Sequence, residues 1–508
     1  MIAIRANRVT RFNAPAEVTK VIQTYIDDFE MSIKRQEMKL GVDYYRSKNT
    51  EIMNRRKMIY VEDDNGNPSE MDDPYKANNK LASGYFKLLV DQKISYLLGN
   101  AITIEGDDQD ELSDTLPTMW QKKVNEVAKE ASKKSRGFAQ VYIGEDGKLG
   151  IKQIPSEQII PVYQPHNREE LELVIRYYEV TVLDEDGQSA QVNRVEVWDD
   201  ETVAYYQEQT SDGLYKLLDQ EEMMSIFGQP YQNPKYHFQK NLRFGEKIAE
   251  SEGHSWGRVP FVPLYNNDEE DYDLAPIKSY IDAYDIISSD FINNLDDLQD
   301  IFWVLKGYNG QNVSEFIREV KRYKAMKVSD DGDARAETID IPHEAREKAL
   351  KIIEDNIFVF GQGVNPNKIG DGNITNVVIK SRYAMLDLKC DMFEDEVEEF
   401  LRSIIRFANR YREINNQQPI EISKINFNRA MMVNEIELLE ANTKQRGHIS
   451  QETADSNHPW IDNHSVEEER RERDVGDYVD LDRVNEIEDR IREIVISQMK
   501  IEEKEGGE

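Results

Sequence analysis

The stretch GQGVNPNKIGDGN at residues 361–373 runs directly into a long helical pattern, and these two features organise the rest of the chain. Its four glycines, three asparagines and one proline favour a mobile, turn-rich backbone over a packed element. From Val378 to Tyr411 apolar residues recur at steps of mostly three and four without a proline, as an amphipathic helix requires. Thr375 or Asn376 can cap its start. At about 1.5 Å per residue the helix is a rod of roughly 50 Å, so we expect a loop at a tip followed by a helix that spans a domain.

Two shorter helices are predicted upstream of this loop, with a small mixed segment between them. Residues 274–298 place apolar side chains on one stripe and acidic or amide side chains on the other faces. Residues 342–360 begin with proline, which the first turn of a helix tolerates. The segment between them has the pattern of a strand (301–306), a helix (313–323) and two strands around a turn at 330–333. We therefore expect a compact α/β insert between two helices.

The first half of the chain is predicted to combine helices with an antiparallel meander. Residues 77–98 have a helical pattern that ends at Gly99, a residue suited to the left-handed position after a helix, and a second helix is expected at 116–135. Seven short alternating strands follow between residues 138 and 219, separated by turns rich in Asp and Gly. Three remaining stretches are expected to be a peripheral helical arm (1–41), an exposed loop that begins at Met58, and a linking loop (222–255).

The composition limits the classes of function. The 508 residues suggest about three domains, and 64 basic against 98 acidic residues give a net charge of −34, which opposes binding of a polyanion by counterion release. On composition alone this charge argues against a sequence-specific nucleic-acid binder and fits a solvated acidic surface. No apolar run approaches the roughly 20 residues that cross a bilayer, and the start lacks a signal segment. The single cysteine, Cys390, excludes an internal disulfide and is expected to be a small core residue.

An enzymatic interpretation would depend on three acidic clusters that could bind Mg²⁺ in a nuclease. These clusters, at 107–111, 296–300 and 330–333, flank turns or lie on a polar helix face, where adjacent acids project in different directions. None of the seven histidines belongs to an HExxH motif, and the loop at 361–373 lacks the GxxxxGK[ST] pattern. We expect no catalytic residue, no metal site and no cofactor. The sequence leaves two functions open at this point: a metal-dependent DNA-processing enzyme, and a scaffold or adaptor protein without a channel.

The order of helix, small α/β insert, returning helix, Gly/Asn loop and long helix resembles the stem, clip, stem, tunnel loop and long wing helix of tailed-bacteriophage portal proteins. WGRVPFVPLYNND at 256–268 resembles the segment before the first stem helix in portals of long-tailed phages of Gram-positive bacteria. FKLLVDQKISYLLG at 86–99 is similar to their N-terminal helix, and IFWVLKGYNG at 301–310 is similar to the stretch that leads into the clip. The resemblance extends over roughly residues 44–432.

This resemblance implies an α+β, multidomain portal fold. It contains a wing built from helices plus an antiparallel meander, an α-helical stem, a small α/β clip, a long wing helix and a mainly α-helical crown. In such a fold the wing meets the capsid and the crown faces its interior. The implied boundaries are 1–271 for the N-terminal arm and wing, 272–300 for the first stem helix, 301–341 for the clip, 342–360 for the second stem helix, 361–376 for the tunnel loop, 377–425 for the long wing helix and 426–508 for the crown and acidic C-terminal tail.

The resemblance also implies a structural role without catalysis. Portal proteins form a homo-oligomeric ring, usually of twelve subunits, at one capsid vertex, through which double-stranded DNA is packaged and ejected. The partners implied are the terminase large subunit during packaging, then the head-tail adaptor, together with the major capsid and scaffolding proteins and DNA of any sequence. No membrane partner is implied. For such a channel the net charge of −34 fits an acidic wall along which DNA slides as well as it fits a solvated acidic surface. The implied location is the virion, at the portal vertex, and the host cytoplasm during assembly.

Two groups of site residues follow from the resemblance. In the tunnel loop, Lys368 is the only cation, and three asparagines can offer hydrogen bonds to phosphates of any sequence. The insert carries four basic residues that would form the clip's docking face, although a solvated amphipathic helix explains them equally well. The residues expected are Asn365, Asn367, Lys368 and Asn373 for DNA, and Arg318, Lys321, Arg322 and Lys324 for docking.

Overall fold

The structure is a computed structural model of the chain. It divides into two compact units, one built from Met1–Asn365 and Tyr383–Ala430 and the other from Pro366–Arg382 and Met431–Glu508. The residues that the structure describes are 15–62, 68–73, 76–106, 115–117, 119–144, 148–183, 189–209, 214–228, 231–244, 247–297, 302–306, 333–337, 343–368, 375–430, 435–445, 448–450, 453, 467–468, 470–471 and 473.

The largest sheet in the described part of the chain is antiparallel, with six strands in the order β10-β9-β8-β7-β6 and β11 also paired to β9. Side chains alternate between the two faces of a strand. On β7, Ile175 therefore faces one apolar cluster and Val174 faces another. The strands are β6 (Ile159–Gln164), β7 (Asn167–Leu183), β8 (Ser189–Trp198), β9 (Thr202–Glu208), β10 (Tyr215–Leu217) and β11 (Lys235–Tyr236).

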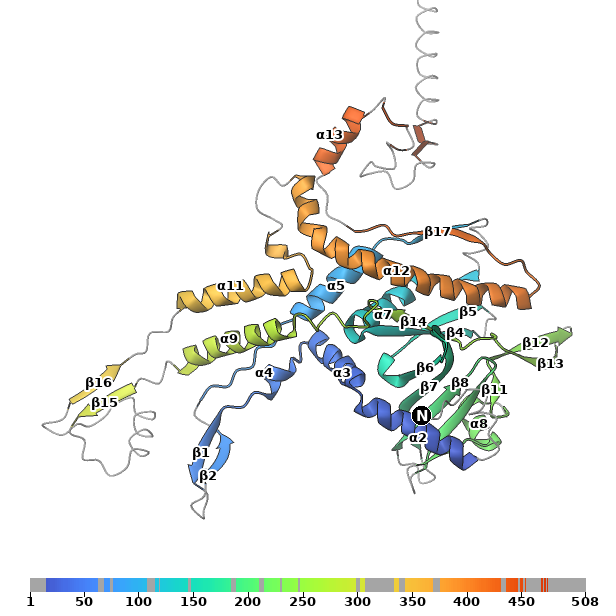
Figure 1. Ribbon diagram of the computed structural model, residues 1–508, viewed down its shortest axis with the longest axis horizontal. Coiled ribbons are helices and arrows are strands. Elements are labelled where there is room, and N and C mark those ends of the chain that lie inside the picture. Colours follow the sequence, from blue (N-terminus) through green and yellow to red (C-terminus); the bar gives the residue numbers. More distant parts are fainter. Residues whose placement is uncertain are drawn as a thin grey trace, which may run out of the picture. The chain divides into compact units, whose positions relative to one another are not determined.

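Helix α2 (Pro15–Met31) covers one face of this sheet (Figure 1). Its apolar side chains, from Val18 to Phe29, recur at steps of three and four and are buried against the strands. The rings of Phe29 and Tyr177 meet edge to face with centroids 6.3 Å apart. The expectation of a peripheral arm is therefore wrong for residues 15–41, because their apolar stripe belongs to the core.

Strands β4 and β5 belong to a second sheet, in the order β14-β4-β5. All seven strands expected between residues 138 and 219 form, and the expected antiparallel meander is confirmed for β6 to β10, which pair in chain order. It does not include β4 and β5, because the turn η1 (Ser156–Gln158) separates β5 from β6. The other edge of β4 pairs with β14, from Phe261 opposite Gln140 to Tyr265 opposite Arg136. The bounds are β4 (Arg136–Ile143), β5 (Leu149–Ile154) and β14 (Phe261–Tyr265).

Two stretches expected to be loops contain regular structure. The stretch that begins at Met58 forms the antiparallel hairpin β1–β2, and the stretch 222–255 contains most of α8 and the hairpin β12–β13. Asp219 and Glu222 form a capping box at the start of α8. Backbone pairing between two strands requires no apolar stripe, so composition alone missed these hairpins. The bounds are β1 (Met58–Glu62), β2 (Pro68–Asp72), α8 (Gln220–Phe227), β12 (Phe238–Phe244) and β13 (Lys247–His254).

The central helices differ from expectation at their ends. The helix predicted at 77–98 begins only at Tyr85, and the segment before it has no regular structure. Gly99 has φ −71° and ψ −34°, so the left-handed conformation expected there is wrong. A Cβ at this position would lie 2.2 Å from the Ser95 carbonyl oxygen, which gives a steric reason for glycine. The helices are α3 (Ile33–Tyr45), α4 (Thr50–Asn54), α5 (Tyr85–Leu98) and α7 (Trp120–Lys134).

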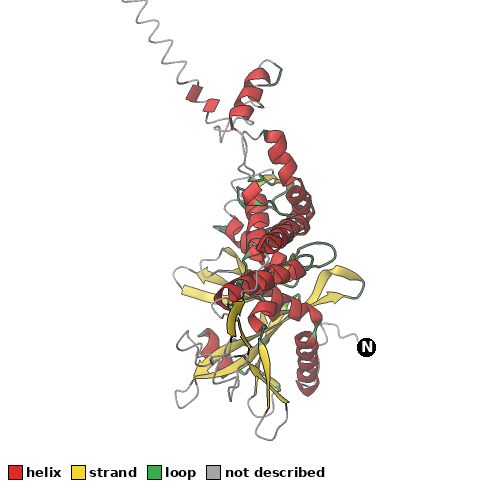
Figure 2. Cartoon of the chain, turned by 90° about the vertical axis from the view of Figure 1, so that its left-hand side faces the viewer, coloured by secondary structure: helices red, strands yellow, loops and turns green. Residues whose placement is uncertain are grey.

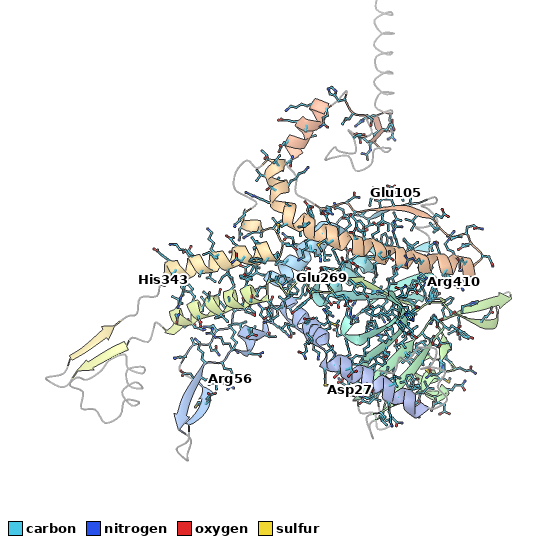
Figure 3. The ribbon with its side chains drawn as sticks, viewed as in Figure 1. Asp27, Arg56, Glu105, Glu269, His343 and Arg410 are labelled. Carbon is cyan, nitrogen blue, oxygen red and sulfur yellow. The ribbon has the colours of Figure 1, made fainter. Side chains whose placement is uncertain are left out.

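Helices α9 (Lys278–Asp297) and α11 (His343–Phe360) lie side by side and antiparallel (Figure 1). The rings of Tyr280 and Phe360 stack at 5.2 Å near one end, and Phe291 meets His343, which Figure 3 labels at the start of α11, at 5.7 Å near the other. Between these helices in sequence, β15 (Phe302–Lys306) pairs antiparallel with β16 (Asp333–Glu337). Both helices and these two strands were predicted; the insert helix expected at 313–323 lies outside the described residues.

Helix α12 (Asn376–Ile414) has 39 residues, which confirms the long helix predicted from periodicity. Cys390 on its apolar stripe is fully buried, as expected. After this helix, β17 (Ile422–Asn426) pairs with β3 (Thr103–Gly106), and α13 (Glu435–Gln445) follows. Figure 2 shows most of the strands in the lower half of the view. Within the described residues, no helix is both long and apolar enough to cross a membrane.

Candidate functional site

Helix α11 ends at Phe360, and the residues that follow return the chain to the side of α5. Gln92 of α5 binds this return with its side-chain amide, because Nε2 donates to the Val364 carbonyl at 2.9 Å and Oε1 accepts from the Val364 N–H at 2.8 Å. Val364 itself is buried. A side-chain amide that pairs with both backbone groups of one residue fixes it much as a neighbouring strand would. We call residues 361–365 the return segment.

Two glycines allow the return segment to lie this close to α5. A Cβ at Gly363 would lie 2.2 Å from Leu89 Cδ2, and a Cβ at Gly361 would lie 2.7 Å from Leu89 Cδ1. Both separations are well below carbon–carbon contact distance, so any side chain would displace Leu89. The expectation of a mobile tip is therefore wrong for the return segment, which packs against the body. Residues 369–374 of the predicted loop lie outside the described residues.

A buried cluster of charges lies beside the return segment. Lys93 of α5 donates to Asn266 Oδ1 at 2.7 Å and lies 3.3 Å from Asp273 Oδ2. Lys389 of α12 lies 3.2 Å from Asp273 Oδ1 and donates to the Gly361 carbonyl at 3.1 Å. One carboxylate thus connects α5, the segment after β14 and α12, and α12 in turn binds the return segment. We call Lys93, Asp273 and Lys389 the junction cluster.

Burial and pairing act in opposite directions on the junction cluster. Burial lowers the pKa of Lys93 to about 8, although Asp273 favours its charged form. Burial would raise the pKa of Asp273, but the ammonium groups of Lys389 and Lys93 hold that pKa at about 2. The Phe393 ring, 3.9 Å from the Lys93 ammonium, adds a cation–π contact. The aspartate is therefore ionised at neutral pH and is the counter-ion of both lysines.

A second set of polar contacts attaches α9 to the body. The chain segment just before α5 runs along α9. Every second residue of this segment donates its backbone N–H, and every fourth residue of α9 accepts one with its side chain. Four helical residues rise about 6 Å and two nearly extended residues span about 6.6 Å, so the two repeats match. The three accepting side chains are at most 1% exposed. The pairs are Ser83 N–H with Asp285 Oδ1 at 2.9 Å, Leu81 N–H with Ser289 Oγ at 2.9 Å, and Asn79 N–H with Asn293 Oδ1 at 2.6 Å.

The sequence left two interpretations of the acidic residues open, an acidic channel wall and a solvated acidic surface. For two acidic residues of α9, the contacts with neighbouring segments give the explanation instead. Asp285 is buried, and burial raises its pKa although Asn49 and Ser83 donate to it. Asp290 lies 2.9 Å from a guanidinium nitrogen of Arg55. These two carboxylates attach α9 to neighbouring segments, so they do not support an acidic channel wall.

The predicted DNA-contacting residues are only partly described. Asn365 is half-buried, and its amide nitrogen lies 3.4 Å from Glu354 Oε1. Asn367 and Lys368 are exposed, and the Lys368 carbonyl accepts from Arg382. Among the described residues no cluster of His, Cys, Asp or Glu could hold a metal ion. Asn373 and the four docking residues Arg318, Lys321, Arg322 and Lys324 lie outside the described residues.

The residues that organise this region were not singled out from the sequence. One signal was present: Lys93 occupies a core position of α5, between Val90 and Ile94 on the side that the fold buries. A lysine at such a position requires a buried partner. Its partners Asp273 and Lys389 lie far along the chain, so their identity could not be inferred.

The family model and the curated proteins that match this chain are phage portal proteins. The family described as "Phage portal protein, SPP1 Gp6-like" matches residues 23–477. The "Portal protein" of Bacillus phage SPP1 is 29% identical over 474 residues, which cover 91% of this chain and 88% of that protein. The "Portal protein" of Clostridium phage phiCD119 is 29% identical over 451 residues, which cover 84% and 90%.

Among solved structures, a chain titled "Neck of empty GTA particle computed with C6 symmetry" aligns with a TM-score of 0.35 and 13% identity, over 73% of this chain and 88% of that one. The family match, in contrast, begins within α2 and extends beyond α13, so it includes the return segment and the junction cluster. The chain therefore belongs to the SPP1 Gp6-like family of phage portal proteins, the structural proteins through which phage DNA is packaged.

Proposed function

We propose that this chain forms a ring of about twelve subunits at one vertex of the capsid, through which double-stranded DNA enters during packaging and leaves at ejection. Family membership supports this proposal. The observation that carries its mechanical part is the attachment of the pair α9–α11 to the body at both helices. Asp285, Ser289 and Asn293 attach α9, and Gln92 binds the chain as it leaves α11. A ring that receives force from a motor needs such fixed joints.

The segment between the two helices, residues 301–341, is the docking face in this proposal. It binds the terminase large subunit while DNA is packaged and the head-tail adaptor afterwards, with Arg318, Lys321, Arg322 and Lys324 as its basic contacts. The pairing of β15 with β16 supports a folded insert at this position. Major capsid and scaffolding proteins contact the ring during assembly, which takes place in the host cytoplasm, and the chain has no catalytic turnover.

The loop that follows the return segment contacts the DNA in this proposal. Lys368 supplies a positive charge, and Asn365, Asn367 and Asn373 supply hydrogen bonds to phosphates without reading the sequence. The exposure of Asn367 and Lys368 supports this role. The return segment holds the start of this loop in place, because α12 and α5 both bind the return segment.

The experiment that tests the ring is native mass spectrometry combined with negative-stain imaging of the purified chain. The expected result is a particle of about twelve subunits with a central hole and no Mg²⁺-dependent cleavage of DNA. A monomer or dimer in the presence of scaffolding protein and capsid would contradict the ring. Cleavage of DNA that needs Mg²⁺ would favour the nuclease instead.

The loop is tested separately in a packaging assay with Lys368→Glu. We expect the amount of DNA packaged to fall several-fold, because a carboxylate repels the phosphates, while ring mass stays unchanged. The matched control is Lys348→Glu at an exposed position of α11. Equal packaging by the two variants would contradict the contact between the loop and DNA.

A further inference from the structure

A groove of about 1320 Å³ crosses the body beside the middle of α12. Four parts of the fold line it: the turn between β6 and β7 with the first residues of β7, Asp200 in the turn between β8 and β9, the segment from Gly257 to Glu270, and α12 from Asp395 to Phe407. Phe261, a buried residue of β14, contributes to its apolar lining. The groove belongs entirely to the first compact unit, so its walls are fixed by the packing of that unit.

The groove has many more carboxylates than cations. Its cations are Arg258 and Arg406, and Arg406 is paired with Glu399 at 2.9 Å. Burial, followed by the charge and hydrogen bond of Asp268, raises the pKa of Glu396 to about 7. Carboxylates crowded in this way favour the arrival of positive charge. The acidic residues that line the groove are Glu170, Glu172, Asp200, Asp268, Glu270, Asp395, Glu396 and Glu399.

The segment before α2 has the opposite charge. Residues 1–14, MIAIRANRVTRFNA, contain three arginines and no acidic residue, in a chain with a net charge of −34. Arg5, Arg8 and Arg11 recur every third residue, with apolar residues such as Val9 between them. We call residues 1–14 the arginine segment. Its alternation of basic and apolar side chains matches a groove that combines carboxylates with phenylalanine rings.

The groove and α2 lie on different faces of the large sheet. Helix α2 packs on the face that carries Ile175, whereas Val259 and Phe261 of the groove pack on the face that carries Val174. A 14-residue segment spans at most about 50 Å, and within one chain it would have to pass around the sheet to reach the groove. In a closed ring each subunit offers one surface to the subunit before it and a different surface to the one after it, so the segment of one copy can serve the next.

We propose that the groove binds the arginine segment of a neighbouring copy of this chain, with the arginines paired to the carboxylates of α12 and of the segment after β14. This inference rests on the ring proposed above. The contact repeats from subunit to subunit and closes around the ring, and each copy contributes a segment and receives one. Electrostatic complementarity of this kind increases the rate and the specificity of association.

Disulfide formation between engineered cysteines tests the contact in the full chain. The pair is Thr10→Cys with Ser403→Cys, a groove residue of α12. The matched control is Thr10→Cys with Ser423→Cys, an exposed serine outside the groove lining. The native Cys390 is fully buried and thus slow to react. We expect mild oxidation to give a ladder of covalent multimers for the groove pair, at least tenfold faster than for the control.

Two results of this experiment would overturn the proposal. If Thr10→Cys and Ser403→Cys form a disulfide only within one chain, the arginine segment binds the groove of its own chain. Equal rates for the two pairs would show that the groove has no preference for the segment. Replacing Arg5, Arg8 and Arg11 together with glutamate should slow the linkage about tenfold, and replacing them with lysine should not.

A peptide titration separates this proposal from ring formation. A fluorescent peptide of residues 1–14 is titrated against the full chain whose own three arginines are replaced by glutamate. We expect saturable binding that weakens about tenfold when Asp268→Asn and Asp395→Asn are added, whether the protein is a ring or a monomer. Absence of peptide binding while rings form would overturn the groove proposal alone. Peptide binding by a protein that forms no ring would overturn only the proposed function.

Discussion

The junction cluster and the groove are two acidic regions built on the same two elements, yet their charges are arranged in opposite ways. Asp273 and Asp268 both follow β14, and Lys389 and Glu396 lie two turns apart on α12. In the junction cluster one buried carboxylate lies within 3.3 Å of two ammonium groups. In the groove, carboxylates face one another, and the pKa of Glu396 rises to about 7 as a result of burial and of Asp268.

Acidic residues in this protein therefore have two separate uses. A buried carboxylate is tolerated only when cations or hydrogen-bond donors surround it, so Asp273 and Asp285 hold elements together. A carboxylate that faces other carboxylates at an open groove weakens the isolated subunit and favours a basic partner. The net charge of −34 therefore does not describe a uniform surface.

The largest effect is expected for Asp273→Asn. The change leaves Lys93 and Lys389 buried without a counter-ion, which costs about 3–5 kcal/mol for a broken buried pair. Hydrogen exchange of the α5 amides measures this loss as reduced protection. The matched control is Asp268→Asn in the groove, which should leave α5 protection unchanged. Equal losses for the two variants would remove the distinction between the regions.

A smaller loss is expected for Asp285→Ala. It leaves the Ser83 N–H without its acceptor in a buried contact, at a cost of about 1–3 kcal/mol. Faster proteolysis of the segment before α5, together with reduced exchange protection of α9, would report it. Asp395→Ala in the groove serves as the comparison, and no change is expected there. A stable Asp285→Ala protein would show that the repeat of contacts along α9 contributes little.

Gly363→Ala perturbs the buried region without changing any charge. Its Cβ would lie 2.2 Å from Leu89 Cδ2, so Leu89 must move, which costs about 1–3 kcal/mol for an overpacked site. We expect a lower melting temperature of the purified chain and weaker protection of the Val364 amide, which Gln92 binds. An unchanged melting temperature would show that Leu89 relocates freely. The comparison is Gly257→Ala, which lies at the groove, has φ +70° and meets no atom within 4 Å, so its cost is backbone strain alone.

The smallest effect concerns Glu396→Gln and pH. The folded pKa of Glu396, about 7, lies above its ordinary value of 4.5, so the folded state binds the proton more tightly and stability falls as pH rises from about 4.5 to 7. Because the side chain is half-exposed, the effect is less than about 1 kcal/mol. The melting temperature of the wild type should therefore fall more between pH 5 and pH 8 than that of the variant. Asp273 has the opposite sign, since its pKa of about 2 gives stability that is lost as pH falls from about 4 through 2.

Local periodicity was enough to predict several elements from the sequence. The regular spacing of apolar residues predicted α12 and α11, and alternation predicted the strands from β4 to β10. These patterns succeed because a helix or strand repeats its contacts over a few residues. The same reasoning failed for the hairpins β1–β2 and β12–β13, whose pairing leaves no apolar stripe in the sequence.

The candidate site was less predictable than the fold. The sequence indicated that residues 361–373 form a glycine-rich connection and that Asn365, Asn367, Asn373 and Lys368 could contact DNA, a prediction that stays open. It gave no indication that Gln92 would bind Val364 or that glycine was needed beside Leu89. The close approach of two distant segments sets both requirements, and neither is visible in the composition of one of them.

The order of the main helices and of the strands from β4 to β10, the acidic balance of the chain and the stretches that resemble the portal family could all be read from the sequence, because each depends on residues close together in the chain. Which acids are buried and paired, and which line an open groove, depends on contacts that form only when the chain folds. The pKa of a carboxylate is set by burial and by charges within a few ångströms, and the partners of Asp273 lie more than a hundred residues away from it.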